Sequence, residues 1–167
     1  MNSKMIPSVF TLANLLLGVL AILFTFENEI QLAAVMILIG MVLDGMDGKI
    51  ARRLDATSPF GKELDSLCDL VSFGVAPAVL TYAYALKSFP YVGLVITLAF
   101  TLCGAIRLAR FNVLNISDYF VGVPITAAGS LMAILVLLGN RLPTLTFPIA
   151  MALLSYLMIS KLKVPKY

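Results

Sequence analysis

The stretch DGMDGKIARRLDATSPFGKELDSLCD, residues 44–69, joins two long apolar runs of the chain. It holds six of the nine acidic residues in the whole sequence. Four aspartates among the six lie inside the flanking apolar segments: Asp44, Asp47, Asp65 and Asp69. An aspartate at the centre of a bilayer costs about 2.5 to 3.5 kcal/mol, so four uncompensated aspartates would cost roughly 10 kcal/mol. The sequence therefore predicts that another group offsets their charge.

The composition around this stretch predicts an all-α integral membrane protein. The chain has 167 residues, of which 60% are hydrophobic and 13% charged, against about 25% charged in soluble domains. A soluble monomer of this size cannot hide so much apolar surface, so lipid must be its main solvent. The basic residues behind the net charge of +3 are scattered in short loops, which fits lipid headgroups better than nucleic acid. We expect one membrane domain over residues 1–167.

Six apolar runs are candidate transmembrane helices, the last two short enough to need tilt or a thinner bilayer. They cover residues 7–26, 30–53, 62–86, 91–109, 121–139 and 145–161. Ser58 and Pro59 are typical of an N-cap and first turn ahead of the third helix. Six spans place ten lysines and arginines on one side and only Lys87 and Arg141 on the other. This asymmetry predicts that both termini are cytoplasmic.

The acidic residues are the main candidates for chemistry, because the chain contains no histidine. This absence excludes a Ser-His-Asp triad and histidine-bearing zinc sites. The two cysteines, Cys68 and Cys103, form no CxxC pair, so they predict neither a disulfide framework nor a metal knuckle. The sequence also lacks the glycine patterns of P-loops and dinucleotide-binding folds.

The spacing of the four aspartates predicts a shared cation site. Asp44 and Asp47 are three residues apart, and Asp65 and Asp69 are four apart, so each pair lies on one face of its helix. The two pairs fall at similar depth in an antiparallel helical hairpin. Oxygen-only ligands suit a hard cation such as Mg²⁺, Mn²⁺ or Ca²⁺. Two such cations would make a clamp for phosphoryl transfer.

Other interpretations of the acidic residues remain open. Ion pairs with Arg52, Arg53 or Lys62 at the membrane edge would explain Asp55 and Glu63. Intramembrane aspartates also line ion paths, so a divalent-cation channel or carrier is a second functional class. Such a path should continue across the bilayer, whereas these carboxylates cluster at one depth near one surface.

Residues 44–69 resemble the signature of the CDP-alcohol phosphotransferase family. Eight fixed positions match, with eight residues between Arg52 and Gly61: Asp44, Asp47, Gly48, Ala51, Arg52, Gly61, Asp65 and Asp69. The resemblance implies that Asp44, Asp47 and Asp65 ligate two divalent cations, with Asp69 as a general base that is also close to a metal. It implies a pocket for a cytidine nucleotide and its diphosphate, shaped by Gly48, Ala51, Arg52 and Gly61. It also implies a homodimer with one site in each protomer.

Three flanking segments are similar to members of this family that use serine as the acceptor alcohol. They are IPSVFTLANLLLG at 6–18, SFGVAPA at 72–78 and RLARFN at 107–112. The resemblance implies transfer of a phosphatidyl group from a CDP-activated diradylglycerol lipid, such as CDP-diacylglycerol, to L-serine, with release of CMP. This reaction would take place near the cytoplasmic face of the cell membrane.

The acceptor side of this reaction is less sharply specified. Arg107, Arg110 and Asn112 could hold the serine carboxylate or a lipid phosphate. The two arginines are equally well explained as topological anchors. Glycerol 3-phosphate or inositol phosphate is the alternative acceptor, although a phosphorylated acceptor would favour a denser basic pocket.

Overall fold

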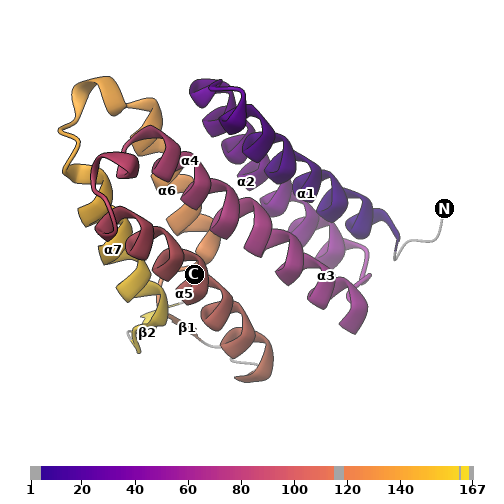
Figure 1. Ribbon diagram of the computed structural model, residues 1–167. Coiled ribbons are helices and arrows are strands. Elements are labelled where there is room, and N and C mark those ends of the chain that lie inside the picture. The colour runs from indigo at the N-terminus through magenta and orange to yellow at the C-terminus, as the bar shows by residue number, and fades with distance from the viewer. Residues whose placement is uncertain (1–4, 115–118, 162, 166–167) are drawn as a thin grey trace.

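The structure, a computed structural model, describes residues 5–114, 119–161 and 163–165 and forms a bundle of helices (Figure 1). The helices are α1 (Met5–Phe26), α2 (Ile30–Arg53), α3 (Pro59–Asp69), α4 (Ala76–Tyr84), α5 (Val92–Leu114), α6 (Ile125–Leu137) and α7 (Thr146–Ile159). A π-helical segment, Leu70–Val75, joins α3 to α4 without a break. Single 3-10 turns, Leu86–Ser88 and Gly139–Arg141, follow α4 and α6. Two short strands, β1 (Tyr119–Val121) and β2 (Lys163–Pro165), pair antiparallel.

The helix lengths agree with the predicted helical membrane architecture. Within the described residues, four continuous helical segments are long and apolar enough to cross a membrane: Met5–Phe26, Ile30–Arg53, Pro59–Tyr84 and Val92–Val113. The helices α6 and α7 have 13 and 14 residues, so each is only about 20 Å long. A hydrocarbon core is about 30 Å thick. The count of six complete spans therefore stays a prediction.

Three of the predicted helix boundaries differ from the structure by three residues or more. The fourth span, predicted to end at residue 109, continues as α5 to Leu114. The prediction ended the span where the apolar run ends, but a helix can continue through polar residues beyond it. The fifth, predicted from residue 121, begins at Ile125, because β1 and a turn at Gly122 come first. Gly122 has φ +78°, and a Cβ there would lie 2.6 Å from the Met158 carbonyl oxygen. The third begins at Pro59 and changes to π geometry at Leu70.

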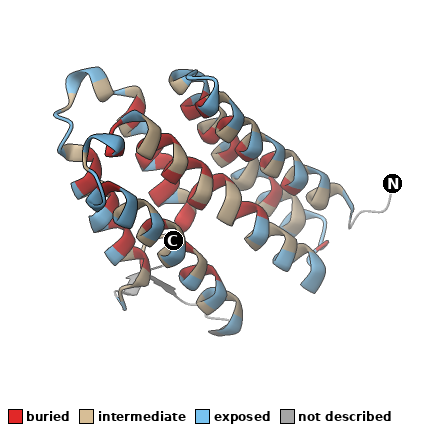
Figure 2. Ribbon diagram, viewed as in Figure 1, coloured by how far each residue is buried: buried red, intermediate tan, exposed pale blue. Residues whose placement is uncertain are grey.

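The outer face of α1 shows why this bundle needs lipid around it. Figure 2 shows exposed residues along the outward faces of the helices and buried residues between them. On α1, large apolar side chains that are 40% to 61% exposed recur every three or four residues: Val9, Leu12, Leu16, Val19 and Leu23. This spacing makes a continuous apolar stripe. In water such a stripe would drive aggregation, whereas in a bilayer it faces acyl chains.

The way the helices pack places the acidic stretch, residues 44–69, at one end of the bundle. α1 packs along α2, α5 packs against α7, and α6 contacts α2, α4 and the π-helical segment. Phe73, Phe100 and Phe147 are among the largest fully buried side chains. The start of α1, the end of α2 and the start of α3 lie together at the same end (Figure 1).

Ser58 caps α3 as its sequence context predicts. The Ser58 Oγ accepts a hydrogen bond of 3.0 Å from the backbone N–H of Gly61, and Pro59 occupies the first helical turn. Replacing Ser58 with alanine leaves that N–H without its acceptor, so we expect the free energy of unfolding to fall by about 0.5 to 2 kcal/mol. Thermal unfolding in detergent measures this loss, with Ser58→Asp as a cap-competent control. Equal stability of Ser58→Ala and wild type would contradict the role of this cap.

Candidate active site

Carboxylates from α2 and α3 converge at this end of the bundle. Oxygens of Asp44, Asp47 and Asp65 all lie within 4.8 Å of one another. Asp69 follows one turn later at the end of α3, and its carboxylate interacts electrostatically with those of Asp65, Asp44 and Asp47. The structure thus brings together four side chains that the sequence places on two helices.

This cluster fits a divalent cation by the chemistry of its donors. The Asp65 Oδ1 is buried and has no hydrogen-bond partner among the described residues. A buried polar atom without a partner is costly, and several carboxylates at this separation repel one another. A hard cation would offset both costs, because it prefers oxygen ligands from carboxylates. Asp44, Asp47 and Asp65 can therefore hold a metal ion.

Uncharged hydrogen-bond donors on two other helices contact the carboxylates of the aspartates. The Thr11 hydroxyl on α1 lies 2.9 Å from Asp47 Oδ2, and the Asn14 amide lies 3.5 Å from Asp69 Oδ1. On α6, the Thr126 hydroxyl lies 3.4 Å from Asp44 Oδ2. Each contact engages one oxygen of a carboxylate, which leaves its other oxygen for a ligand. Outer contacts of this kind orient metal ligands in proteins.

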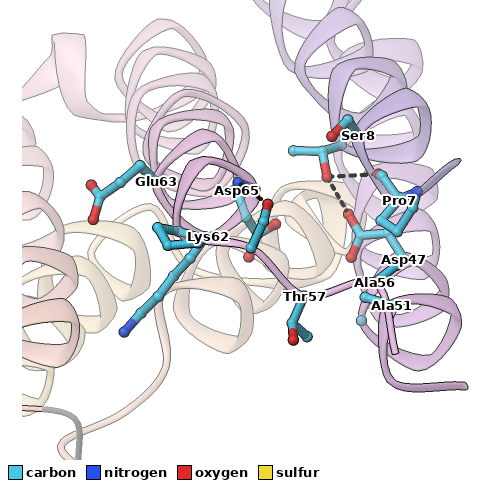
Figure 3. Close-up of a pocket in the computed structure, with 14 residues that line it drawn as sticks. Pro7, Ser8, Asp47, Ala51, Ala56, Thr57, Lys62, Glu63 and Asp65 are labelled. Carbon is cyan, nitrogen blue, oxygen red and sulfur yellow. Dashed lines mark hydrogen bonds between the residues drawn. The ribbon is translucent and has the colours of Figure 1, made fainter. Parts of the chain in front are cut away.

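A cavity of about 640 Å³ opens beside the aspartates. Figure 3 shows Asp47 and Asp65 projecting toward it from opposite sides, while Lys62 extends away from them. The cavity lies between the start of α1, the end of α2, the connecting loop and the first turns of α3. It is lined by Pro7, Ser8, Thr11, Asp47, Gly48, Ala51, Ala56, Thr57, Ser58, Pro59, Gly61, Lys62, Glu63 and Asp65.

Three of the four predicted nucleotide-pocket residues line this cavity. They are Gly48, Ala51 and Gly61. A Cβ at Gly48 would meet no atom within 4 Å, so the backbone there borders open space that a ligand can approach. The fourth residue, Arg52, is exposed at the end of α2 and is absent from the cavity lining.

The three predicted acceptor residues have different environments. Arg107 is buried on α5, its guanidinium lies 5.7 Å from the Phe111 ring centre, and its Nε has no hydrogen-bond partner in the described part of the chain. The Asn112 amide donates a 2.9 Å hydrogen bond to Ser66 of α3. Arg110 instead donates to the Ile159 carbonyl at the end of α7, at 3.1 Å. Of the two arginines, Arg110 therefore has a structural partner and Arg107 has an open donor.

Sequence reasoning missed the three neutral donors. A signal for two of them exists, because Thr11 and Asn14 are three residues apart on one face of an otherwise apolar helix. Polar residues at membrane depth mark functional sites more often than chance. Thr126 offers no such signal, since a lone threonine in an apolar helix usually bonds to its own backbone.

Comparisons with known proteins show which family this chain resembles. The family model described as CDP-alcohol phosphatidyltransferase matches residues 4–159. Three similar relatives bear the name CDP-diacylglycerol–serine O-phosphatidyltransferase. The one from Bacillus subtilis is 41% identical over 97% of this chain and 90% of the relative. The one from Methanocaldococcus jannaschii is 41% identical over 97% and 74%, and one from Helicobacter pylori J99 is 39% identical over 96% and 72%.

Proposed function

Because this chain belongs to the CDP-alcohol phosphatidyltransferase family, we propose that it transfers a phosphatidyl group from a CDP-activated diradylglycerol lipid to L-serine and releases CMP. The observation that carries the proposal is the convergence of three carboxylates beside a cavity of about 640 Å³. Several relatives that are 38% to 41% identical are named for CDP-diacylglycerol and serine. The product would be phosphatidylserine or its ether-lipid equivalent.

In this proposal the four aspartates divide into ligands and a base. Asp44, Asp47 and Asp65, with Asp69 close by, would hold two divalent cations such as Mg²⁺, Mn²⁺ or Ca²⁺. When bound, such ions would neutralise the diphosphate and the departing CMP. Asp69 would accept the proton of the serine hydroxyl. A new bond then forms from the serine oxygen to the lipid-side phosphorus, and the bond from that phosphorus to the CMP oxygen breaks.

The cavity beside the aspartates is our candidate for the nucleotide half of the donor. Gly48, Ala51 and Gly61 border it without bulky side chains, so a cytidine and its diphosphate could approach the backbone there. Arg52 would have to reach a diphosphate from the exposed rim of this pocket. Its planar fork suits that task because it can bind two oxygens.

For the acceptor we favour the α5 side of the aspartates. Arg107 interacts electrostatically with Asp69 and keeps an open Nε donor in the described part of the chain, so it could bind the serine carboxylate. Asn112 is held against α3 through Ser66, and its buried Oδ1 lacks a partner among the described residues. Arg110 would then bind the end of α7 through the Ile159 carbonyl and would not contact the substrate.

The proposed topology follows from the same arrangement. We infer six spans in the cell membrane, with both termini and the active site near the cytoplasmic face. Lys87 and Arg141 lie in the turns after α4 and α6, where the opposite face is expected. A site at this depth would meet a lipid donor from the bilayer and a water-soluble acceptor from the cytoplasm. A homodimer, with one site in each protomer, is part of the proposal.

A divalent-cation channel fits the structure less well. In the described part of the chain, the acidic residues outside the segment 44–69 are Glu27 and Glu29, in and beside the turn between α1 and α2. Buried apolar residues separate them from the aspartate cluster. An ion path needs polar groups along its length. Uptake of Mn²⁺ into sealed vesicles without nucleotide would favour a channel over a transferase.

An acceptor panel tests the proposed reaction. Purified protein with CDP-diacylglycerol and Mn²⁺ is expected to release CMP with L-serine as acceptor, because one buried arginine suits a carboxylate better than a phosphate. Glycerol 3-phosphate, inositol phosphate and D-serine serve as comparison acceptors, and CMP is quantified by chromatography. Release of CMP with a phosphorylated alcohol but none with L-serine would overturn the choice of acceptor while leaving the reaction class in place.

A further inference from the structure

Asn14 connects the candidate base to the π-helical segment that follows it. The residue is fully buried in α1. Its side-chain amide lies 3.5 Å from Asp69 Oδ1, and its backbone carbonyl accepts a 2.9 Å hydrogen bond from the Ser72 hydroxyl. Asp69 ends α3, and Ser72 lies within the π-helical segment. One residue of α1 therefore contacts the chain on both sides of the change from α to π geometry.

Two glycines on neighbouring helices make room for these contacts. A Cβ at Gly40 of α2 would lie 2.7 Å from the Asn14 Oδ1. A Cβ at Gly18 of α1 would lie 2.5 Å from the Ser72 Oγ and 2.8 Å from its Cα. Real Cβ atoms do not approach other atoms this closely, so a larger residue at either place would displace Asn14 or Ser72. Asn14 is thus bordered by α2 at its side-chain amide and by the π-helical segment at its backbone carbonyl.

Burying the Asn14 side chain costs free energy of folding, which indicates that the residue has a role beyond packing. Its Oδ1 is buried without a hydrogen-bond partner among the described residues, and an unsatisfied buried acceptor opposes folding. A leucine of nearly the same shape would be cheaper in an apolar helix. What leucine cannot supply is an N–H aimed at the Asp69 carboxylate. The 3.5 Å distance is long for a hydrogen bond, as is common before substrate tightens a catalytic site.

We propose that Asn14 is a positioning residue for Asp69. Its amide holds Oδ1 of the aspartate, and the link to Ser72 fixes the turn on which Asp69 is carried. Oδ2 is thereby left as the oxygen that accepts the acceptor's proton. This inference rests on the proposed function, because it assigns Asn14 a role only if Asp69 is the base. Outer groups that orient a reacting or ligating residue typically contribute 10- to 100-fold in activity.

The test uses purified Asn14→Leu and Asn14→Ala with CDP-diacylglycerol, L-serine and MnCl₂. We expect kcat to fall about 10- to 100-fold in both, with an unchanged KM for CDP-diacylglycerol and unchanged Mn²⁺ binding by electron paramagnetic resonance. Asn14→Leu should also keep or raise the melting temperature, because it removes an unsatisfied polar group. The matched control is Thr25→Ala, a buried polar residue of α1 whose hydroxyl bonds only to its own helix, at the Ala21 carbonyl.

A second variant perturbs the amide without removing it. Gly40→Ala places a methyl group against the Asn14 Oδ1 and is expected to lower kcat while Asn14 stays in place. Full kcat in both Asn14 variants would overturn the inference and leave the proposed function intact. Parallel losses of Mn²⁺ binding, lipid affinity and melting temperature would also overturn it, because they indicate a structural role. Failure of wild-type protein to release CMP with any acceptor would overturn the proposed function, and this inference with it.

Discussion

Replacing Asp69 with asparagine is expected to lower kcat about 10²- to 10⁴-fold, the usual contribution of a general base. The substitution keeps the shape of the side chain but removes its ability to take a proton from the acceptor hydroxyl. Asp44, Asp47 and Asp65, whose oxygens cluster within 4.8 Å, remain in place. Binding of CDP-diacylglycerol should therefore survive. The measurements are CMP release under saturating substrate and equilibrium binding of the CDP-lipid to the same preparation.

The matched control for this prediction is Asp55→Asn. Asp55 is exposed in the loop before α3 and has φ +48°, a backbone conformation that asparagine tolerates well. The control should therefore turn over at the wild-type rate. Near-normal kcat in Asp69→Asn would refute the assignment of Asp69 as the base. Loss of CDP-lipid binding together with kcat would instead place Asp69 among the groups that hold the donor.

Removal of divalent cations is expected to reduce CMP release to the background rate. The physical reason is that several carboxylates held this close cannot also accommodate a diphosphate unless cations offset the combined negative charge. Protein treated with EDTA and desalted should regain activity when Mn²⁺ or Mg²⁺ is added back. Melting curves of the chelated protein, recorded in parallel, separate loss of a ligand from loss of the fold. Turnover at the full rate after chelation would contradict the metal-dependent account.

The fold was predictable where local signals act alone. The end of the first apolar run matches α1, and both ends of the second run match α2. Ser58 and Pro59 mark the start of α3 because an N-cap is a contact within one turn. Such features depend on residues that are neighbours in sequence, so a single chain is enough to find them.

The π-helical segment could not be predicted in this way. Residues 70–75 continue an apolar helical pattern, and no local signal separates α from π geometry there. The structure places Ser72 against the Asn14 carbonyl and Gly18, which are more than 50 residues away along the chain. β1 and β2 depend on a similarly distant pairing. Both features are decided by packing partners that a pattern of hydrophobicity does not reveal.

The candidate site was likewise predictable where local spacing decides it and not where tertiary packing does. Helical spacing places each pair of aspartates on one face, and the antiparallel hairpin places the two pairs at similar depth, so their convergence was predictable. The donors Thr11 and Asn14 contact them through tertiary packing of α1 on α2 and α3. The Thr11 hydroxyl also lies 2.9 Å from the Pro7 carbonyl. Because threonines in helices commonly make this backbone contact, a single threonine in an apolar helix does not by itself indicate a functional site. The sequence also did not reveal where two arginines lie: Arg52 is exposed at the end of α2, outside the cavity lining, and Arg110 donates to the Ile159 carbonyl.

Direct measurement of Mn²⁺ binding tests the central claim that carboxylates of α2 and α3 jointly hold divalent cations. Electron paramagnetic resonance can titrate free Mn²⁺ against wild-type protein, Asp65→Asn and the loop control Asp55→Asn in the same detergent. Saturable binding by wild type and Asp55→Asn is expected, with affinity reduced at least about 10-fold in Asp65→Asn. Indistinguishable Mn²⁺ binding by all three proteins would contradict the claim.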